Sequence, residues 1–156
     1  MQSVARSLSE TYSAQPESVA RARAAVAGFA AEAGASRRQI DDIRLATSEA
    51  VTNSVVHAYG DQPGSVYLTA AIVADELWVL IADDGSGLQP RSDRPGLGLG
   101  LGLIARVSDD LAIVPRSSGG TELRMRFSLP VAERFRRGRA RRHGGRTHGV
   151  SAPSRR

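Results

Sequence analysis

The chain has 156 residues, a length typical of one domain with its own core. Cysteine is absent, which excludes disulfides, thiolate metal sites and cysteine nucleophiles; lysine is absent too, which excludes a Walker A phosphate loop. The net charge of +5 is unevenly divided, because residues 133–156 hold nine arginines and one acid, whereas residues 1–132 hold twelve arginines and fifteen acids. No apolar run is long enough to span a membrane and no signal peptide is visible, so we expect a cytoplasmic protein.

The first elements of the chain are predicted to be a short strand and a helix. Residues 3–12 alternate weakly between polar and apolar side chains, which indicates an edge strand. Pro16 is tolerated in the first turn of a helix, and the alanine-rich segment after it predicts a helix that Gly34 ends.

A second helix carries the first chemically informative pair. Ser36 and Gln39 have the spacing of a capping box, and apolar residues recur at helical spacing from there to about Tyr59. Glu49 and Asn53 lie one turn apart beside the apolar stripe, where a carboxylate and an amide can face a cleft. An isolated pair of this kind is also compatible with a polar surface, so its meaning depends on the rest of the chain.

Two strands follow, at residues 65–73 and 76–83, and the short link between them predicts an antiparallel hairpin. The second strand ends in Asp83-x-Gly85-x-Gly87. A carboxylate at a strand end can accept a hydrogen bond from an exocyclic amine, and the glycines allow a flat ring to approach the backbone. Alone, the motif is also compatible with an ordinary turn.

A glycine-rich segment opens the third predicted helix. Glycines at positions 96, 98, 100 and 102 precede Leu103 and Ile104, so successive N–H groups and a helix N-terminus could face an anion. A flexible loop with packing leucines is the alternative interpretation. Residues 111–114 then predict a strand, and residues 121–129 alternate cleanly, which predicts a last strand with its odd-numbered apolar side chains turned inward.

Helices that precede a mostly antiparallel sheet predict an α/β fold: a two-layer sandwich with a mixed, mostly antiparallel sheet covered on one face by helices. Residues 1–131 form the predicted domain. Residues 132–156 are rich in arginine and glycine and poor in apolar side chains, so we expect a disordered tail.

The polar residues suit the handling of a nucleotide. Asn53 offers a neutral oxygen of the kind that binds Mg²⁺, and Glu49 could take a proton from an attacking hydroxyl. Thr121, at the start of the last strand, could support Asp83 through a hydroxyl hydrogen bond, although a threonine in a turn needs no such role.

The motifs resemble a known family. They are Glu49-x-x-x-Asn53, Asp83-x-Gly85-x-Gly87, Gly96-x-Gly98-Leu99-Gly100-Leu101 and Gly120-Thr121, in this order. Together they resemble the ATP-binding fold shared by gyrase, histidine kinases and a heat-shock chaperone, over roughly residues 8–130. Within it, SEAVTNSVVHAY is similar to the anti-sigma-factor serine kinases.

The resemblance implies specific roles for these residues. Asn53 would be the Mg²⁺ ligand, Glu49 the general base, and Asp83 the adenine anchor with Gly85 and Gly87 beside it. Gly96, Gly98, Gly100 and Leu101 would belong to a lid over the phosphates of ATP, and Arg94 would reach the terminal phosphate. Thr121 would be a further nucleotide-binding residue that supports Asp83. The family's partners would be an anti-anti-sigma protein with a STAS domain, whose serine is phosphorylated, a sigma factor, and a second copy of the chain.

Two alternatives remain open. A binding module could hold ATP and a partner without phosphotransfer, although such a module has no need of a base at Glu49. The arginine-rich tail could contact nucleic acid or a membrane surface. A Rossmann interpretation of the glycines fails, because they follow a helix and a hairpin instead of the first strand of a parallel sheet.

Overall fold

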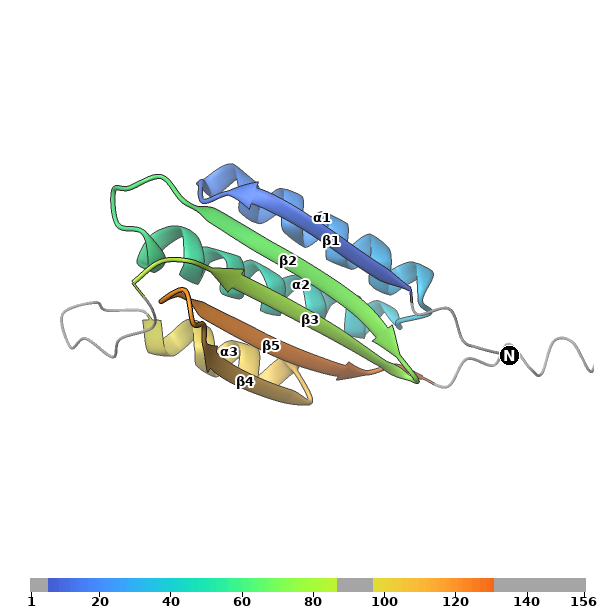
Figure 1. Cartoon of the computed structure of the whole chain (residues 1–156). Coiled ribbons are helices and arrows are strands. Elements are labelled where there is room, and N and C mark those ends of the chain that lie inside the picture. The colour runs from blue at the N-terminus through green and yellow to red at the C-terminus, as the bar shows by residue number, and fades with distance from the viewer. Residues whose placement is uncertain (1–5, 87–96, 131–156) are drawn as a thin grey trace, which may run out of the picture.

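The structure is a computed structural model, and it describes residues 6–86 and 97–130. The elements along the chain are β1 (Ser7–Ser13), α1 (Pro16–Glu32), α2 (Arg37–Asn53), the π-helical turn η1 (Ser54–Ala58), β2 (Ser65–Val73), β3 (Glu76–Asp83), α3 (Leu97–Val107), β4 (Asp110–Pro115) and β5 (Thr121–Ser128). Figure 1 shows the described helices together on one face of the sheet. The predicted two-layer α/β sandwich is therefore confirmed.

The five strands lie in the order β1-β2-β3-β5-β4, and every neighbouring pair is antiparallel. The sheet is thus fully antiparallel in the described residues, where the sequence predicted a mixed and mostly antiparallel one. The β2–β3 hairpin turns through Ala74, which has a positive φ of 54°. Asp83 is the last residue of β3 and pairs with Val66 of β2. It lies at the same end of the strands as Thr121, the first residue of β5.

The core lies between the helices and the sheet. Alternation along β5 places Leu123, Met125 and Phe127 inward, as predicted, while Arg124 is exposed. The helices contribute small and branched side chains, among them Val26 of α1 and Ile43, Ala50 and Val51 of α2, all fully buried. This packing fixes the position of α2 on the sheet, and with it the polar pair that α2 carries.

The local signals at the helix ends are confirmed. The side chain of Ser36 accepts a hydrogen bond from the N–H of Gln39 at 3.3 Å, and the Gln39 side chain accepts one from the N–H of Ser36 at 3.0 Å. Gly34 follows α1 with a φ of 95°, a conformation that favours glycine. Both ends could be predicted because each depends on residues close together in the chain.

Three boundaries differ from the prediction. β1 begins at Ser7 instead of residue 3, and residues 1–5 lie outside the described part of the chain. The predicted single helix up to Tyr59 ends instead in the π-helical turn η1. α3 begins at Leu97, so the glycines at 98, 100 and 102 lie inside the helix and not before it. Glycine disfavours a helix interior, but burial of Ile104 and partial burial of Leu101 against the core offset that cost.

In the ranges 6–86 and 97–130, no helix is long and apolar enough to cross a membrane. The predicted domain boundary at residue 131 and the predicted tail of residues 132–156 lie outside these ranges.

Candidate functional site

The start of α3 lies directly against the polar pair of α2. A Cβ added to Gly100 would lie 2.9 Å from Oε2 of Glu49 and 3.5 Å from Oδ1 of Asn53. Glycine allows this close approach, because a larger residue would displace the carboxylate of Glu49. Glu49 is half-buried and Asn53 is only 7% exposed, so both side chains lie between the two helices.

The amide of Asn53 is buried with an unused donor. Its Nδ2 atom has no hydrogen-bond partner among the residues that the structure describes. A buried amide without a partner costs free energy, so a ligand oxygen that accepted this hydrogen bond would remove a penalty. The same side chain offers Oδ1, the kind of neutral oxygen that Mg²⁺ binds together with waters and phosphates. Across the described ranges no group of three or more His, Cys, Asp or Glu side chains could hold a metal by itself.

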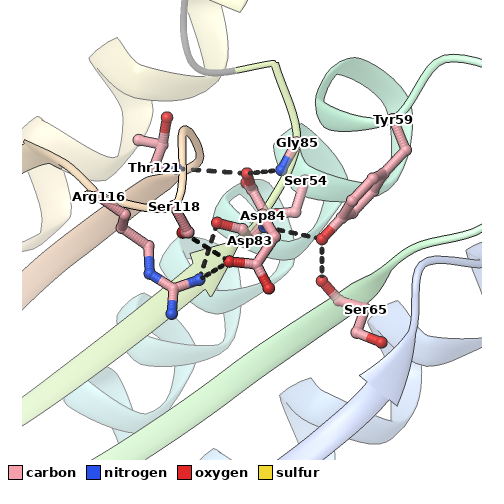
Figure 2. A network of polar contacts seen from close by, with 9 residues as sticks. All are labelled: Ser54, Tyr59, Ser65, Asp83, Asp84, Gly85, Arg116, Ser118 and Thr121. Atoms are coloured by element: carbon pink, nitrogen blue, oxygen red, sulfur yellow. Dashed lines mark hydrogen bonds and ion pairs between the residues drawn. The ribbon is translucent and has the colours of Figure 1, made fainter.

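Asp83 is held by three hydrogen bonds at the end of β3 (Figure 2). Oδ2 accepts from the hydroxyl of Ser54 at 3.0 Å, and Oδ1 accepts from the N–H of Gly85 at 3.1 Å and from the N–H of Thr121 at 3.4 Å. The side chain is buried, with 6% of its surface exposed. A carboxylate has about four acceptor positions, and these hydrogen bonds from described residues use three of them, so the fourth, on Oδ2, could accept from a ligand.

A pocket joins Asp83 to the helix that carries Asn53. Its lining comprises Asn53, Ser54, His57, Ala58, Asp83, Thr121 and Leu123, and its volume is about 10 Å³. That volume accommodates about one water molecule, whereas pockets for small organic ligands measure a few hundred cubic ångströms. A flat ring can therefore reach Asp83 only if the walls of the pocket move apart.

Two glycines allow segments of main chain to come into close contact at Ala58 and Asp83, two of the residues that line this pocket. A Cβ on Gly85 would lie 2.2 Å from the carbonyl oxygen of Ala58, and a Cβ on Gly120 would lie 1.8 Å from that of Asp83. The N–H of Ser86 donates to the same Ala58 carbonyl at 2.8 Å. The segment after β3 is thus packed against η1 on one side and against the β4–β5 turn on the other.

A second polar network surrounds Asp84 (Figure 2). Its carboxylate oxygen Oδ1 accepts from Nη1 of Arg116 at 2.7 Å and from the hydroxyl of Ser118 at 2.7 Å. Its N–H donates to the hydroxyl of Tyr59 at 2.8 Å, and that hydroxyl donates to the carbonyl of Ser65 at 2.5 Å. Hydrogen bonds from Ser118 and then from Tyr67 lower the pKa of Asp84, so this carboxylate stays ionised at neutral pH.

The structure places the predicted site residues in two groups. Glu49, Asn53 and Gly100 meet between α2 and α3, whereas Asp83, Gly85 and Thr121 meet at the end of β3. Gly98 and Leu101 lie in the first turns of α3. The main-chain N–H of Thr121 donates to Asp83, and the hydroxyl contact that the sequence predicted stays a prediction.

Other site residues fall outside the predictions or outside the described residues. Gly87, Arg94 and Gly96 belong to the segment 87–96, which the structure does not describe. Sequence reasoning missed Ser54 and Arg116, which both bind Asp83 from distant positions in the chain. Only Ser54 carried a signal, because it is a polar residue one helical turn after the buried Ala50 and directly follows Asn53.

Comparisons with known proteins agree with this architecture. Residues 12–127 match the histidine kinase-like ATPase domain family. The anti-sigma F factor of Clostridium acetobutylicum is 30% identical over 131 residues, which cover 77% of this chain and 92% of that protein. The serine-protein kinase RsbW of Listeria monocytogenes is 35% identical over 116 residues, which cover 64% of this chain and 74% of that protein.

A solved structure shares the fold as well. The crystal structure of the RsbU and RsbW domains of a Mycobacterium tuberculosis protein superposes with a TM-score of 0.63 at 26% identity, covering 80% of this chain and 32% of that longer chain. The family that the sequence motifs suggested is thereby confirmed. The chain belongs to the histidine kinase-like ATPase family, in the group that contains the anti-sigma F factors and the RsbW serine-protein kinases.

Proposed function

We propose that this chain is an ATP-dependent protein serine kinase and anti-sigma regulatory factor. It phosphorylates a serine of an anti-anti-sigma partner with a STAS domain, and it sequesters a sigma factor. The names of its relatives support both activities. The observation that carries the proposal is the meeting of Glu49, Asn53 and the glycine-bearing start of α3 at one place, beside the pocket that contains Asp83.

The proposed roles follow from the chemistry of each group. The free acceptor position of Asp83 suits the exocyclic amine of adenine, because an ionised carboxylate can only accept. The buried amide of Asn53 suits Mg²⁺ and the phosphate oxygens around it, and Mg²⁺ when bound would neutralise charge on the transferred phosphate. Main-chain N–H groups at the start of α3, with Gly96, Gly98, Gly100 and Leu101, suit the phosphates.

Glu49 is the proposed general base. Its carboxylate is half-buried and lies within contact distance of the Gly100 position, beside Asn53. From there it could take the proton of an incoming serine hydroxyl while that oxygen forms its bond to the terminal phosphorus and ADP leaves. Arg94 is proposed to pair with the terminal phosphate, because the chain contains no lysine that could do so.

The test uses purified full-length chain, labelled ATP with Mg²⁺, and candidate STAS-domain partners. We expect label on a partner serine. Glu49→Gln should keep ATP affinity and lose phosphotransfer by about 10²–10⁴-fold, the usual contribution of a general base. Asn53→Ala should lose Mg²⁺-dependent ATP binding. Asp42→Asn is the matched control, because it makes the same charge change on the same helix.

The outcomes separate the two candidate functions. Normal ATP binding with no labelled partner would favour the alternative of a non-catalytic ATP-binding adaptor. An equal loss of transfer in Asp42→Asn and Glu49→Gln would show that charge on α2, and not a base, is responsible. Calorimetry that detects no Mg²⁺-dependent heat with ATP or ADP would refute both. Size-exclusion chromatography of the chain with and without sigma factor tests sequestration, and the chain alone tests the homodimer that the family resemblance implies.

A further inference from the structure

Arg116, which does not line the pocket, binds the Asp83–Asp84 segment from the β4–β5 turn. Its Nη1 atom donates to the carbonyl oxygen of Asp83 at 2.9 Å and to Oδ1 of Asp84 at 2.7 Å. The residue that carries the base-binding carboxylate is therefore held twice. Its side chain is held from η1, β5 and the following loop, and its carbonyl is held by an arginine of the β4–β5 turn.

The sheet itself does not hold this carbonyl on the β5 side. The β3–β5 ladder ends with the pair Ala82 and Glu122, one residue before Asp83. Gly120 packs directly against the Asp83 carbonyl, because a Cβ there would come within 1.8 Å of its oxygen. The guanidinium of Arg116 thus supplies a hydrogen bond at the point where the ladder stops.

The β4–β5 turn keeps Arg116 in place. The N–H of Arg116 donates to the carbonyl of Gly120 at 2.9 Å, and the N–H of Gly119 donates to the carbonyl of Arg116 at 3.0 Å. The guanidinium also lies 5.3 Å from the centre of the Tyr67 ring, within range of a cation–π contact. The arginine is therefore held at its backbone and, through its guanidinium, by Asp83, Asp84 and Tyr67.

We propose that Arg116 is a positioning residue for nucleotide-base recognition. It fixes the backbone of Asp83 through the Asp83 carbonyl and the Asp84 carboxylate, and so aims the free acceptor position of the Asp83 side chain. This inference rests on the proposed function, because the recognised group is the exocyclic amine of adenine. Its effect is on affinity for the base, since Arg116 contacts neither Glu49 nor Asn53 in the described structure.

A merely structural role would give a different result. The side chains of Arg116 and Asp84 are 31% and 38% exposed, and partly exposed ion pairs contribute little to stability. Loss of the guanidinium should therefore change the melting temperature slightly. The positioning role predicts a larger and selective effect, because a misdirected acceptor weakens only ligands that donate to it.

The experiment is calorimetry of the full chain with two ligands in the presence of Mg²⁺. ADP carries the exocyclic amine, and purine riboside diphosphate has the same ring and phosphates without it. Arg116→Ala should weaken ADP binding about tenfold, the order expected for a degraded hydrogen bond to a charged group, and leave purine riboside diphosphate within about twofold. Arg124→Ala is the control, because it breaks a β5 ion pair with Glu122 and makes the same charge change.

The possible outcomes distinguish the two proposals. Equal weakening of both ligands, or unchanged ADP affinity, would overturn the positioning role while leaving ATP binding in place. A wild-type chain that binds neither ligand would overturn the proposed function, and the role of Arg116 with it. If Arg116→Ala does not fold, Ser118→Ala takes its place, since it removes one donor to Asp84 from an exposed residue. It should show the same selectivity for ADP at about two- to threefold, and equal weakening would overturn the role.

Discussion

A single methyl group at Gly100 should displace the proposed base without unfolding the protein. A Cβ at position 100 would lie 2.9 Å from Oε2 of Glu49, about 0.5 Å closer than an ordinary contact of roughly 3.4 Å. The carboxylate is the end of a flexible, half-buried side chain, so it should move away while the helices stay in place. A displacement of this size is significant, because a misplacement of about 1 Å can cost about 100-fold in rate.

Gly102 provides the matched control in the same helix. A Cβ there meets nothing within 4 Å. Replacing glycine by alanine inside a helix stabilises it by about 0.5–1 kcal/mol. Gly102→Ala should therefore raise the melting temperature and leave phosphotransfer unchanged. Gly100→Ala should gain less stability, because the clash offsets the gain, and should slow single-turnover phosphotransfer by about tenfold or more.

The reasoning is refuted if Gly100→Ala transfers phosphate as fast as the wild type. Slowing by Gly102→Ala as well would show that helix flexibility, and not contact with the carboxylate, controls the rate. The combined variant Gly100→Ala/Glu49→Gln gives a further check. If the methyl group acts through Glu49, it should cause no additional loss in the Glu49→Gln background.

Two further predictions concern stability. Thr47 is fully buried on α2, and its hydroxyl has no hydrogen-bond partner within the described residues. Thr47→Val should therefore raise the free energy of unfolding, measured by urea titration, by about 1 kcal/mol. A decrease would show that the hydroxyl has a partner after all. Burial, together with a hydrogen bond to Glu10, raises the pKa of Tyr12 to about 12. Because the unfolded chain therefore loses this proton at a lower pH than the folded chain, the protonated phenol stabilises the fold. This stabilisation is complete below pH 10 and is lost as the pH rises through 12. Absorbance titration should show a late phenolate step that Tyr12→Phe removes; an unchanged titration curve would contradict the assignment.

The sequence predicted those parts of the fold that depend on neighbouring residues. The capping box of Ser36 and Gln39, the stop at Gly34 and the alternation of β5 are local patterns with one dominant physical cause. The hairpin followed from two β-rich runs separated by Ala74 and a second turn residue. Hence the order and type of elements could be predicted before any contact between distant residues was known.

The site was only partly predictable, because its geometry depends on contacts between distant segments. Glu49 and Asn53 could be paired from helical spacing, but their contact with Gly100 requires the packing of α3 on α2. Arg116 lies 33 residues after Asp83, and no local pattern distinguishes it from other turn arginines. The start of α3 was misplaced because glycine disfavours helices, whereas burial of Ile104 outweighs that preference.

The π-helical turn after Asn53 should make this part of the chain sensitive to the deletion of a single residue. A π-helical turn holds one residue more than an α-helical turn would, and such turns are frequent at functional sites. Here the wider turn directs the carbonyl of Ala58 toward Ser86, which ties the helix to the loop after β3. Removal of one residue between 54 and 58 would restore an ordinary helical turn and rotate the residues at its end by about 100°, which turns the Ala58 carbonyl away from Ser86. The circular dichroism spectrum would change very little, yet the contact between η1 and the loop after β3 would be lost. Residues 54–58 should therefore tolerate substitutions far better than deletions.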